Sequence, residues 1–290
     1  MKNILFLTDY AEHTKYIYQY ALRIGQHFNA IIHFGHIFPL PSPSVLEDDY
    51  GSNIILDPVL DNYLEAQFDL QTEKLKDFAK AQTPKSHQYL IGDFFIRTGN
   101  KTQEILDIAN GEKIDLIVMG MSQKRKITNA LFGNIALDII DKAPCPVFLV
   151  PKKAMYLGLN NIVYASDYES PDLINLQLLL EWAKAFETTL HVIHVITKTT
   201  HIKSIPYIDA LINAFPLELE EGLLEFQFVE GEIQKEIIQH VKDMKGDMIA
   251  LTKGNRKYWT YLLDNSITNG VLGEVEIPVL VFKRKIKVVK

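Results

Sequence analysis

The chain has 290 residues, of which 47% are hydrophobic and 23% charged, values typical of an ordinary globular protein. Its formal net charge of −6 argues against a general nucleic-acid binder, because neutralising phosphates requires a basic surface. A single cysteine, Cys145, excludes an internal disulfide and a cysteine-rich metal site. No apolar run is long enough to cross a membrane, and the start of the chain lacks a signal-peptide pattern, so we expect a cytoplasmic protein.

The first half of the chain predicts alternating strands and helices. Hydrophobic patterning predicts strands over residues 3–8, 30–37, 88–97, 114–119 and 146–150, and helices over 11–28, 60–82, 101–111 and 133–142. The first helix is supported by apolar residues at three- and four-residue steps along one face: Ile17, Ala21, Ile24 and Phe28. Near-continuous apolar strands are typical of a parallel sheet covered by helices on both faces. We therefore expect a doubly wound α/β domain with a five-stranded parallel sheet.

The sequence then repeats itself. A short apolar run that ends in a hydroxyl residue, an aspartate and a tyrosine occurs at residues 4–10 and again at 162–168, with Asp9 and Asp167 lying 158 positions apart. His33 and His36 recur at the same spacing as His191 and His194. Constant spacing of this kind predicts a duplicated domain.

Further along the chain the spacing falls to 132, as between Gly99 and Gly231. The difference indicates an insertion in the first copy, at about residues 38–63. We therefore predict domain 1 over residues 1–152 and domain 2 over residues 158–290.

The predicted insertion is rich in proline, with acidic residues between the prolines: Pro39, Pro41, Pro43, Glu47, Asp48, Asp49 and Pro58. Prolines at alternate positions resist regular structure, so this segment predicts a loop over the surface. A plain surface elaboration is the first interpretation; a lid over a site and a contact for a partner are the alternatives.

Two glycines flank the segment that follows the strand over 114–119. Gly120 stands where that strand ends, and Gly133 stands before the next helix. Glycine lets a ligand approach the backbone closely, and the free amides at a helix start favour phosphate. The same glycines also serve turns and helix caps in any α/β domain, and Asp9 or Asp167 can equally cap the helix that follows it.

The order of these features resembles the universal stress protein family over nearly the whole chain, as two tandem copies. The resemblance rests on strands that end in aspartate and histidine, on Asp-Leu-Ile-Val-Met-Gly at 115–120, and on Ala-Pro-Cys-Pro-Val at 143–147. It implies two adenine nucleotide alpha hydrolase-like domains. It also implies that they pair through their last strands, near 146–150 and 278–282, as an intrachain pseudo-dimer.

The resemblance further implies a nucleotide site in domain 1. In ATP-binding members the phosphate loop reads Gly, two residues, Gly, nine residues, Gly, then Ser or Thr. The adenine and ribose would contact residues on three strand ends. The implied site for ATP or AMP therefore comprises Asp9, Ile37, Met119, Gly120, Gln123, Gly133, Asn134 and Ile135. Two of the four loop positions, Gly120 and Gly133, keep the family residue.

Domain 2 departs further from this loop. Its matching positions are Thr252, Asn255, Asn265 and Ser266, so every glycine is replaced and only the serine is kept. Asparagine tolerates left-handed backbone better than most residues, so the loop's shape can persist without its ligand. We therefore expect at most one adenine nucleotide per chain, in domain 1.

No catalytic motif accompanies these features. The sequence lacks a Walker loop, a nucleophile elbow, a zinc spacing and a dinucleotide fingerprint. Histidines three apart on a strand point to opposite faces, so His33 and His36 are not expected to share a metal, and Cys145 is expected to be a buried thiol.

We therefore predict a non-catalytic stress-response module. The alternatives are a nucleotide-independent scaffold that binds an unknown protein partner or, less strongly, a low-activity nucleotide hydrolase. A homodimer remains open, and neither nucleic acid nor membrane is an expected partner.

Overall fold

The computed structural model describes residues 1–39, 57–121, 134–166, 172–196, 209, 212–253 and 277–283. The strands are β1 (Asn3–Leu7), β2 (Ile31–Phe38), β3 (Ile91–Thr98), β4 (Leu116–Gly120), β5 (Val147–Val150), β6 (Asn161–Ala165), β7 (Thr189–Ile196), β8 (Leu224–Glu230), β9 (Met248–Lys253) and β10 (Val279–Lys283). The helices are α1 (Thr14–Phe28), α2 (Asp57–Gln82), the 3-10 helix η2 (Lys85–Leu90), α3 (Lys101–Gly111), α4 (Asn134–Lys142), α5 (Asp172–Phe186), α7 (Pro216–Glu220) and α8 (Ile233–Asp243).

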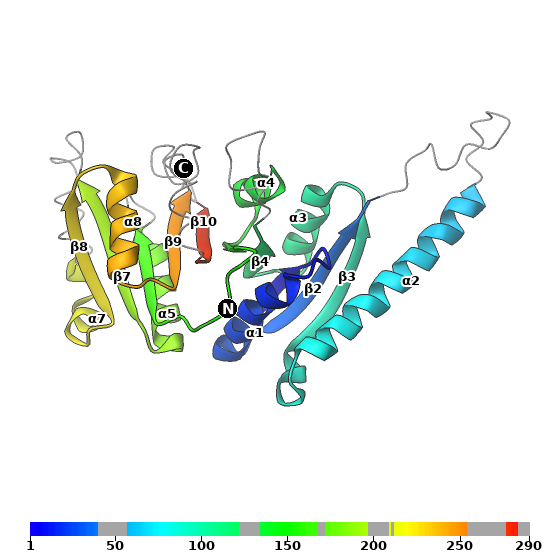
Figure 1. Cartoon of the computed structure of the whole chain (residues 1–290), viewed down its shortest axis with the longest axis horizontal. Helices are drawn as coiled ribbons and strands as arrows, with labels where there is room; N and C mark the ends of the chain where they lie inside the picture. The colour runs from blue at the N-terminus through cyan, green and yellow to red at the C-terminus, as the bar shows by residue number, and fades with distance from the viewer. Residues whose placement is uncertain are drawn as a thin grey trace, which may run out of the picture.

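The ten strands of the described residues form one sheet, in the order β3-β2-β1-β4-β5-β10-β9-β6-β7-β8. Figure 1 shows the two halves side by side. Within each half the neighbouring strands are parallel, and the halves join where β5 and β10 pair antiparallel. Leu149, Phe148 and Val147 lie opposite residues 279, 280 and 281 at this seam. The predicted fold of two five-stranded parallel halves, and their predicted pairing through the last strands, are confirmed.

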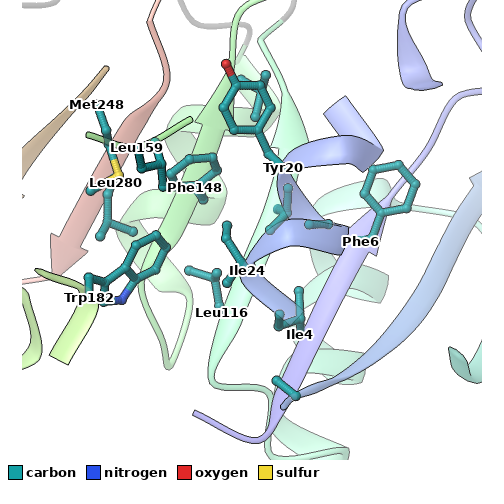
Figure 2. Close-up of a cluster of buried hydrophobic side chains, with 14 of the residues drawn as sticks. Ile4, Phe6, Tyr20, Ile24, Leu116, Phe148, Leu159, Trp182, Met248 and Leu280 are labelled. Atoms are coloured by element: carbon teal, nitrogen blue, oxygen red, sulfur yellow. The ribbon is translucent and has the colours of Figure 1, made fainter. Parts of the chain in front are cut away.

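Helices cover both faces of the sheet, as the apolar strands predict. One core cluster combines the sheet with α1, α2 and α5, and contains Tyr18, Leu75 and Trp182. The other combines it with α3, α4 and α8. The first cluster continues across the seam, because the Phe148 ring lies 5.9 Å both from the Tyr20 ring of the first half and from the Trp182 ring of the second (Figure 2).

The two halves are related by an approximate twofold axis that passes between α1 and α5. His27 Nδ1 donates a hydrogen bond to the carbonyl of Ala185 at 2.7 Å, and the Phe28 and Phe186 rings are 6.3 Å apart. Both contacts join positions that are 158 residues apart, which are equivalent in the duplication. A residue that contacts its own equivalent lies on the symmetry axis, as at an isologous dimer interface.

Three elements begin three residues away from their predicted starts. Helix α2 begins at Asp57, three residues early, with Pro58 in its first turn, where a missing amide hydrogen leaves no bond unmade. Helix α1 begins at Thr14 because residues 9–11 form a separate turn. Strand β3 begins at Ile91, after η2. Most of the proline-rich insertion, residues 40–56, lies outside the described residues.

None of the described helices is long and apolar enough to cross a membrane. The thiol of Cys145 is buried, which confirms the expectation from sequence.

Burial, together with the nearby charge of Asp115, raises the pKa of the Cys145 thiol to about 12. Since the thiolate is the reactive form, we expect Cys145 to resist a thiol reagent such as DTNB at pH 8 in the native protein. One equivalent should react once urea unfolds the chain. A rapid native reaction, measured by absorbance, would contradict this packing.

Candidate functional site

The candidate site lies at the carboxyl edge of the first half, where β1 separates β2 from β4. The chain winds outward from β1 in both directions, so this edge is the topological switch point at which open α/β sheets bind ligands. Leu7 lies opposite Gly35 of β2, and Phe6 lies opposite Val118 of β4. The parallel register brings four predicted residues to this edge: Asp9, Ile37, Met119 and Gly120.

A tight turn after β1 fixes the carboxylate of Asp9. Asp9 Oδ1 accepts hydrogen bonds from the Ala11 amide at 3.0 Å and from Thr14 Oγ1 at 3.3 Å, while the side chain remains exposed. The N-cap of α1 is His13, whose side chain makes no capping bond. Asp9 therefore closes the turn before the helix instead of capping the helix, the alternative left open by the sequence.

Two apolar residues, Ile37 and Met119, which we call the apolar wall, lie near the carboxyl ends of the two strands that flank β1. Ile37 is buried in the core cluster shared with α3 and α4, and Met119 is partly buried against the same cluster. An apolar surface next to a carboxylate suits a flat, partly polar ring such as adenine.

Gly120 has a structural reason to be glycine. A Cβ placed on it would lie 2.6 Å from Cδ1 of Ile17, a buried residue of α1. The close packing of α1 against the end of β4 therefore favours glycine here whether or not a phosphate binds, since any larger residue would have to displace the end of the Ile17 side chain.

The same place in the second half is filled by a polar network. Thr252, the equivalent of Gly120, shares a hydrogen bond of 2.8 Å with the hydroxyl of Tyr164 and accepts one of 2.7 Å from Asn175 Nδ2. At the equivalent positions the first half has two apolar residues, Phe6 and Ile17. Three coupled substitutions thus exchange an apolar contact over a glycine for a buried hydrogen-bonded triad.

The repeated histidines hold the strand ends in both halves. His36 Nδ1 donates to the carbonyl of Thr8 at 2.8 Å, and His194 Nδ1 donates to the carbonyl of Ser166 at 2.9 Å. His33 instead accepts a hydrogen bond of 3.1 Å from the Asp93 amide. Within the described ranges no group of three His, Cys, Asp or Glu residues could hold a metal.

Three lysines act on the two histidines of the first site, His36 and His13. Burial lowers the pKa of His36, and the cations of Lys101 and Lys74 lower it further, against the Thr8 carbonyl and Asp9. Burial also lowers the pKa of His13, where Lys152 and Asp9 act in opposite directions. Lys74 of α2, Lys101 of α3 and Lys152, which follows β5, therefore act on this edge of the sheet, and such cations favour an anionic ligand.

The remaining predicted residues belong to the phosphate loop. Gln123 and Gly133 lie outside the described residues, as does the side chain of Asn134, although the backbone of Asn134 begins α4. Ile135 is an exposed residue of α4. The described residues also exclude four predicted positions of the second half: Asp167, Asn255, Asn265 and Ser266.

Sequence reasoning missed Thr14, Lys74 and the triad of the second half. Thr14 can be recognised as a partner of Asp9 only once the turn after β1 is known. Lys74 can be recognised as a neighbour of the site only once the position of α2 is known. The triad had a readable signal, because all its members are polar where the first copy has Phe6, Ile17 and Gly120.

Buried histidines predict that acid destabilises the protein. Burial is the main cause that lowers the pKa of His36, His194 and His240, so each binds a proton more weakly in the folded state than in the unfolded state. Their contribution to stability is complete above the unfolded pKa of about 6.5 and is lost as the pH falls below it. We expect Tm to fall between pH 7.5 and pH 5, as measured by calorimetry, and His240→Asn to flatten the decline. An unchanged slope in that variant would contradict this assignment.

Comparison with known proteins agrees with this architecture. The profile of the universal stress protein family matches residues 1–151 and again residues 158–283. A universal stress protein of Methanocaldococcus jannaschii is 29% identical over 151 residues, covering 52% of this chain and 82% of the relative. One of Thermus aquaticus is 29% identical over 150 residues, covering 51% of this chain and 98% of the relative.

Solved structures match the whole chain. The crystal structure of a universal stress protein from Archaeoglobus fulgidus superposes with a TM-score of 0.65, at 17% identity, covering 98% of both chains. A putative universal stress protein from Pseudomonas aeruginosa superposes with a TM-score of 0.61, at 15% identity, covering 98% of this chain and 93% of the other. Because each match covers 98% of this chain, these structures have the fold of both of its halves. The chain therefore belongs to the universal stress protein family and carries two copies of its domain.

Proposed function

We propose that the first half binds one adenine nucleotide, ATP or AMP, and that the protein is a non-catalytic regulatory module of the stress response. The proposal is supported by the exposed carboxylate of Asp9, the apolar wall of Ile37 and Met119, and the surrounding lysines. Asp9 would accept hydrogen bonds from the base or the ribose, and the apolar wall would contact the flat face of the base. The phosphates would extend toward the start of α4.

The observation that carries the proposal is the difference between the two strand edges. At Gly120 the strand end carries no side chain of its own and packs against the apolar Ile17, whereas the equivalent edge presents the polar Thr252 bonded to Tyr164 and Asn175. The second half would then serve as a structural partner for the first. Covalent linkage keeps that partner at high effective concentration while its own site diverges.

The substitution Asp9→Ala tests the site. We expect it to weaken ATP or AMP binding by about tenfold or more, since a lost hydrogen bond to a charged group contributes roughly 1.5–3 kcal/mol. Isothermal titration calorimetry measures the affinity and stoichiometry. Asp107→Ala, which removes an exposed carboxylate from α3, is the control and should bind as the natural protein does. Two equivalent sites per chain would contradict the proposal.

A nucleotide-independent scaffold is the second candidate. It is favoured by the structural roles of Gly120, which accommodates Ile17, and of Asp9, which closes its own turn. On this alternative neither ATP, ADP nor AMP at millimolar concentration raises Tm, and native mass spectrometry of the freshly purified protein shows no bound nucleotide.

A further inference from the structure

Tyr10 adopts a backbone conformation that is uncommon for a residue with a side chain. Its φ is 57°, in the left-handed region, immediately after Asp9 at the end of β1. Such a conformation persists only where surrounding contacts stabilise it, and it is concentrated at functional sites.

Contacts from two other elements, α2 and β2, hold the Tyr10 side chain. Its hydroxyl donates a hydrogen bond of 2.9 Å to the carbonyl of Gln71 on α2, and its ring lies 4.4 Å from that of His36 on β2. The ammonium group of Lys74, also on α2, lies 5.0 Å from the ring centroid, within the range of a cation–π contact. Burial raises the pKa of Tyr10 to about 12, so the phenol keeps its proton and remains a donor.

A chain of hydrogen bonds leads from the Tyr10 backbone to the carboxylate of Asp9. The Tyr10 amide donates to Thr8 Oγ1 at 2.9 Å, Thr8 Oγ1 donates to Thr14 Oγ1 at 3.5 Å, and Thr14 Oγ1 donates to Asp9 Oδ1 at 3.3 Å. Thr14 is only 2% exposed, so water competes little for its hydroxyl. The orientation of Asp9 therefore depends on a network that Tyr10 anchors from the opposite side of the turn.

We propose that Tyr10 is a positioning residue for Asp9, and that through Tyr10 helix α2 sets the geometry of the carboxyl edge of the first half. The functional consequence rests on the nucleotide binding proposed above, whereas the positioning of Asp9 does not.

Two substitutions separate the ring from the backbone. Tyr10→Gly removes the ring, yet glycine adopts a φ of 57° without strain, so the turn is not forced into a new conformation. Tyr10→Phe keeps the contacts with His36 and Lys74 and removes only the bond to Gln71. Tyr18→Phe is the matched control, because it removes a buried hydroxyl that pairs with Thr83 at 2.6 Å and takes no part in the turn.

Amide hydrogen exchange of Ala11, measured by NMR without ligand, reports whether Asp9 stays in place. The Ala11 amide is bonded to Asp9 Oδ1, so its exchange should be about tenfold faster in Tyr10→Gly and within about threefold of the natural protein in Tyr10→Phe. Tyr18→Phe should lower Tm and leave this amide unchanged. Unchanged Ala11 exchange in Tyr10→Gly would overturn the proposal.

Titration with ATP then tests the functional consequence. The affinity for ATP should fall about tenfold in Tyr10→Gly and return to the natural value in Tyr10→Phe. In the double variant Asp9→Ala with Tyr10→Gly the affinity should be no lower than in Asp9→Ala alone, because the two changes remove the same interaction. If the losses in ATP affinity of the two single variants add in the double variant, the proposal that Tyr10 acts through Asp9 is wrong. If the natural protein binds no ATP, the proposed function fails, and the exchange data alone decide the role of Tyr10.

Discussion

Phe148→Ala should lower the free energy of unfolding by about 3–5 kcal/mol, the range for deleting a fully buried aromatic ring. Phe148 is 0% exposed, lies opposite Leu280 across the seam, and contacts Tyr20 and Trp182 from the two halves. Its loss removes a ring that contacts both halves within the shared core. We expect urea unfolding, followed by fluorescence and circular dichroism, to become broader or to separate into two transitions.

Phe34→Ala is the control for this effect. Phe34 is also 0% exposed, but its ring packs on Phe6 and Phe94 inside the first half. The substitution should destabilise by a similar amount without weakening the seam. A loss below about 1 kcal/mol for Phe148→Ala, or identical broadening in both variants, would show that the seam depends on other contacts.

Asn175→Ile should cost about 2–3 kcal/mol by breaking the triad of the second half. Asn175 is 5% exposed, and its amide donates to Thr252 at 2.7 Å and to Tyr164 at 3.5 Å. Isoleucine at this position puts an apolar group against buried hydroxyls, and opening a buried polar network is expensive. Urea denaturation measures the loss.

The first half supplies the rescue for this variant. It has phenylalanine, isoleucine and glycine at the three equivalent positions, so Tyr164→Phe, Asn175→Ile and Thr252→Gly together should be more stable than the sum of the single losses predicts. We expect a coupling free energy of about 0.5–3 kcal/mol. The reciprocal Ile17→Asn in the first half should destabilise, because Phe6 and Gly120, the equivalents of Tyr164 and Thr252, carry no hydroxyl to pair with the amide. Additive single losses would mean that the three positions do not act together.

The duplication made most of the fold predictable from sequence. Constant spacing located the equivalent strands, and apolar runs such as residues 147–150 located the buried ones. The start of α1 was not predictable, because it depends on the side-chain bonds that Asp9 makes within its own turn. Helix α2 began early because Pro58 is tolerated in a first helical turn although it breaks helices elsewhere.

The candidate site was predictable only in part. Motif spacing brought Asp9 and Gly120 to one edge, since parallel strands end together. It could not show that Gly120 also accommodates Ile17, because that contact depends on how α1 crosses the strand end. It also gave no sign of the left-handed Tyr10, whose conformation depends on α2, a helix some sixty residues away in the chain.

The antiparallel seam has a consequence for synthesis on the ribosome. Leu149 pairs with Val279, so the partner of β5 is translated 130 residues later, about 6–26 s at ordinary elongation rates. Throughout that interval the nascent first half presents an unpaired apolar edge, Val147–Val150, which is a template for pairing with another chain. Neighbouring ribosomes on one message would bring such edges together. Slow translation of the second half would therefore favour misassembled pairs, and a chaperone that covers β5 would suppress them.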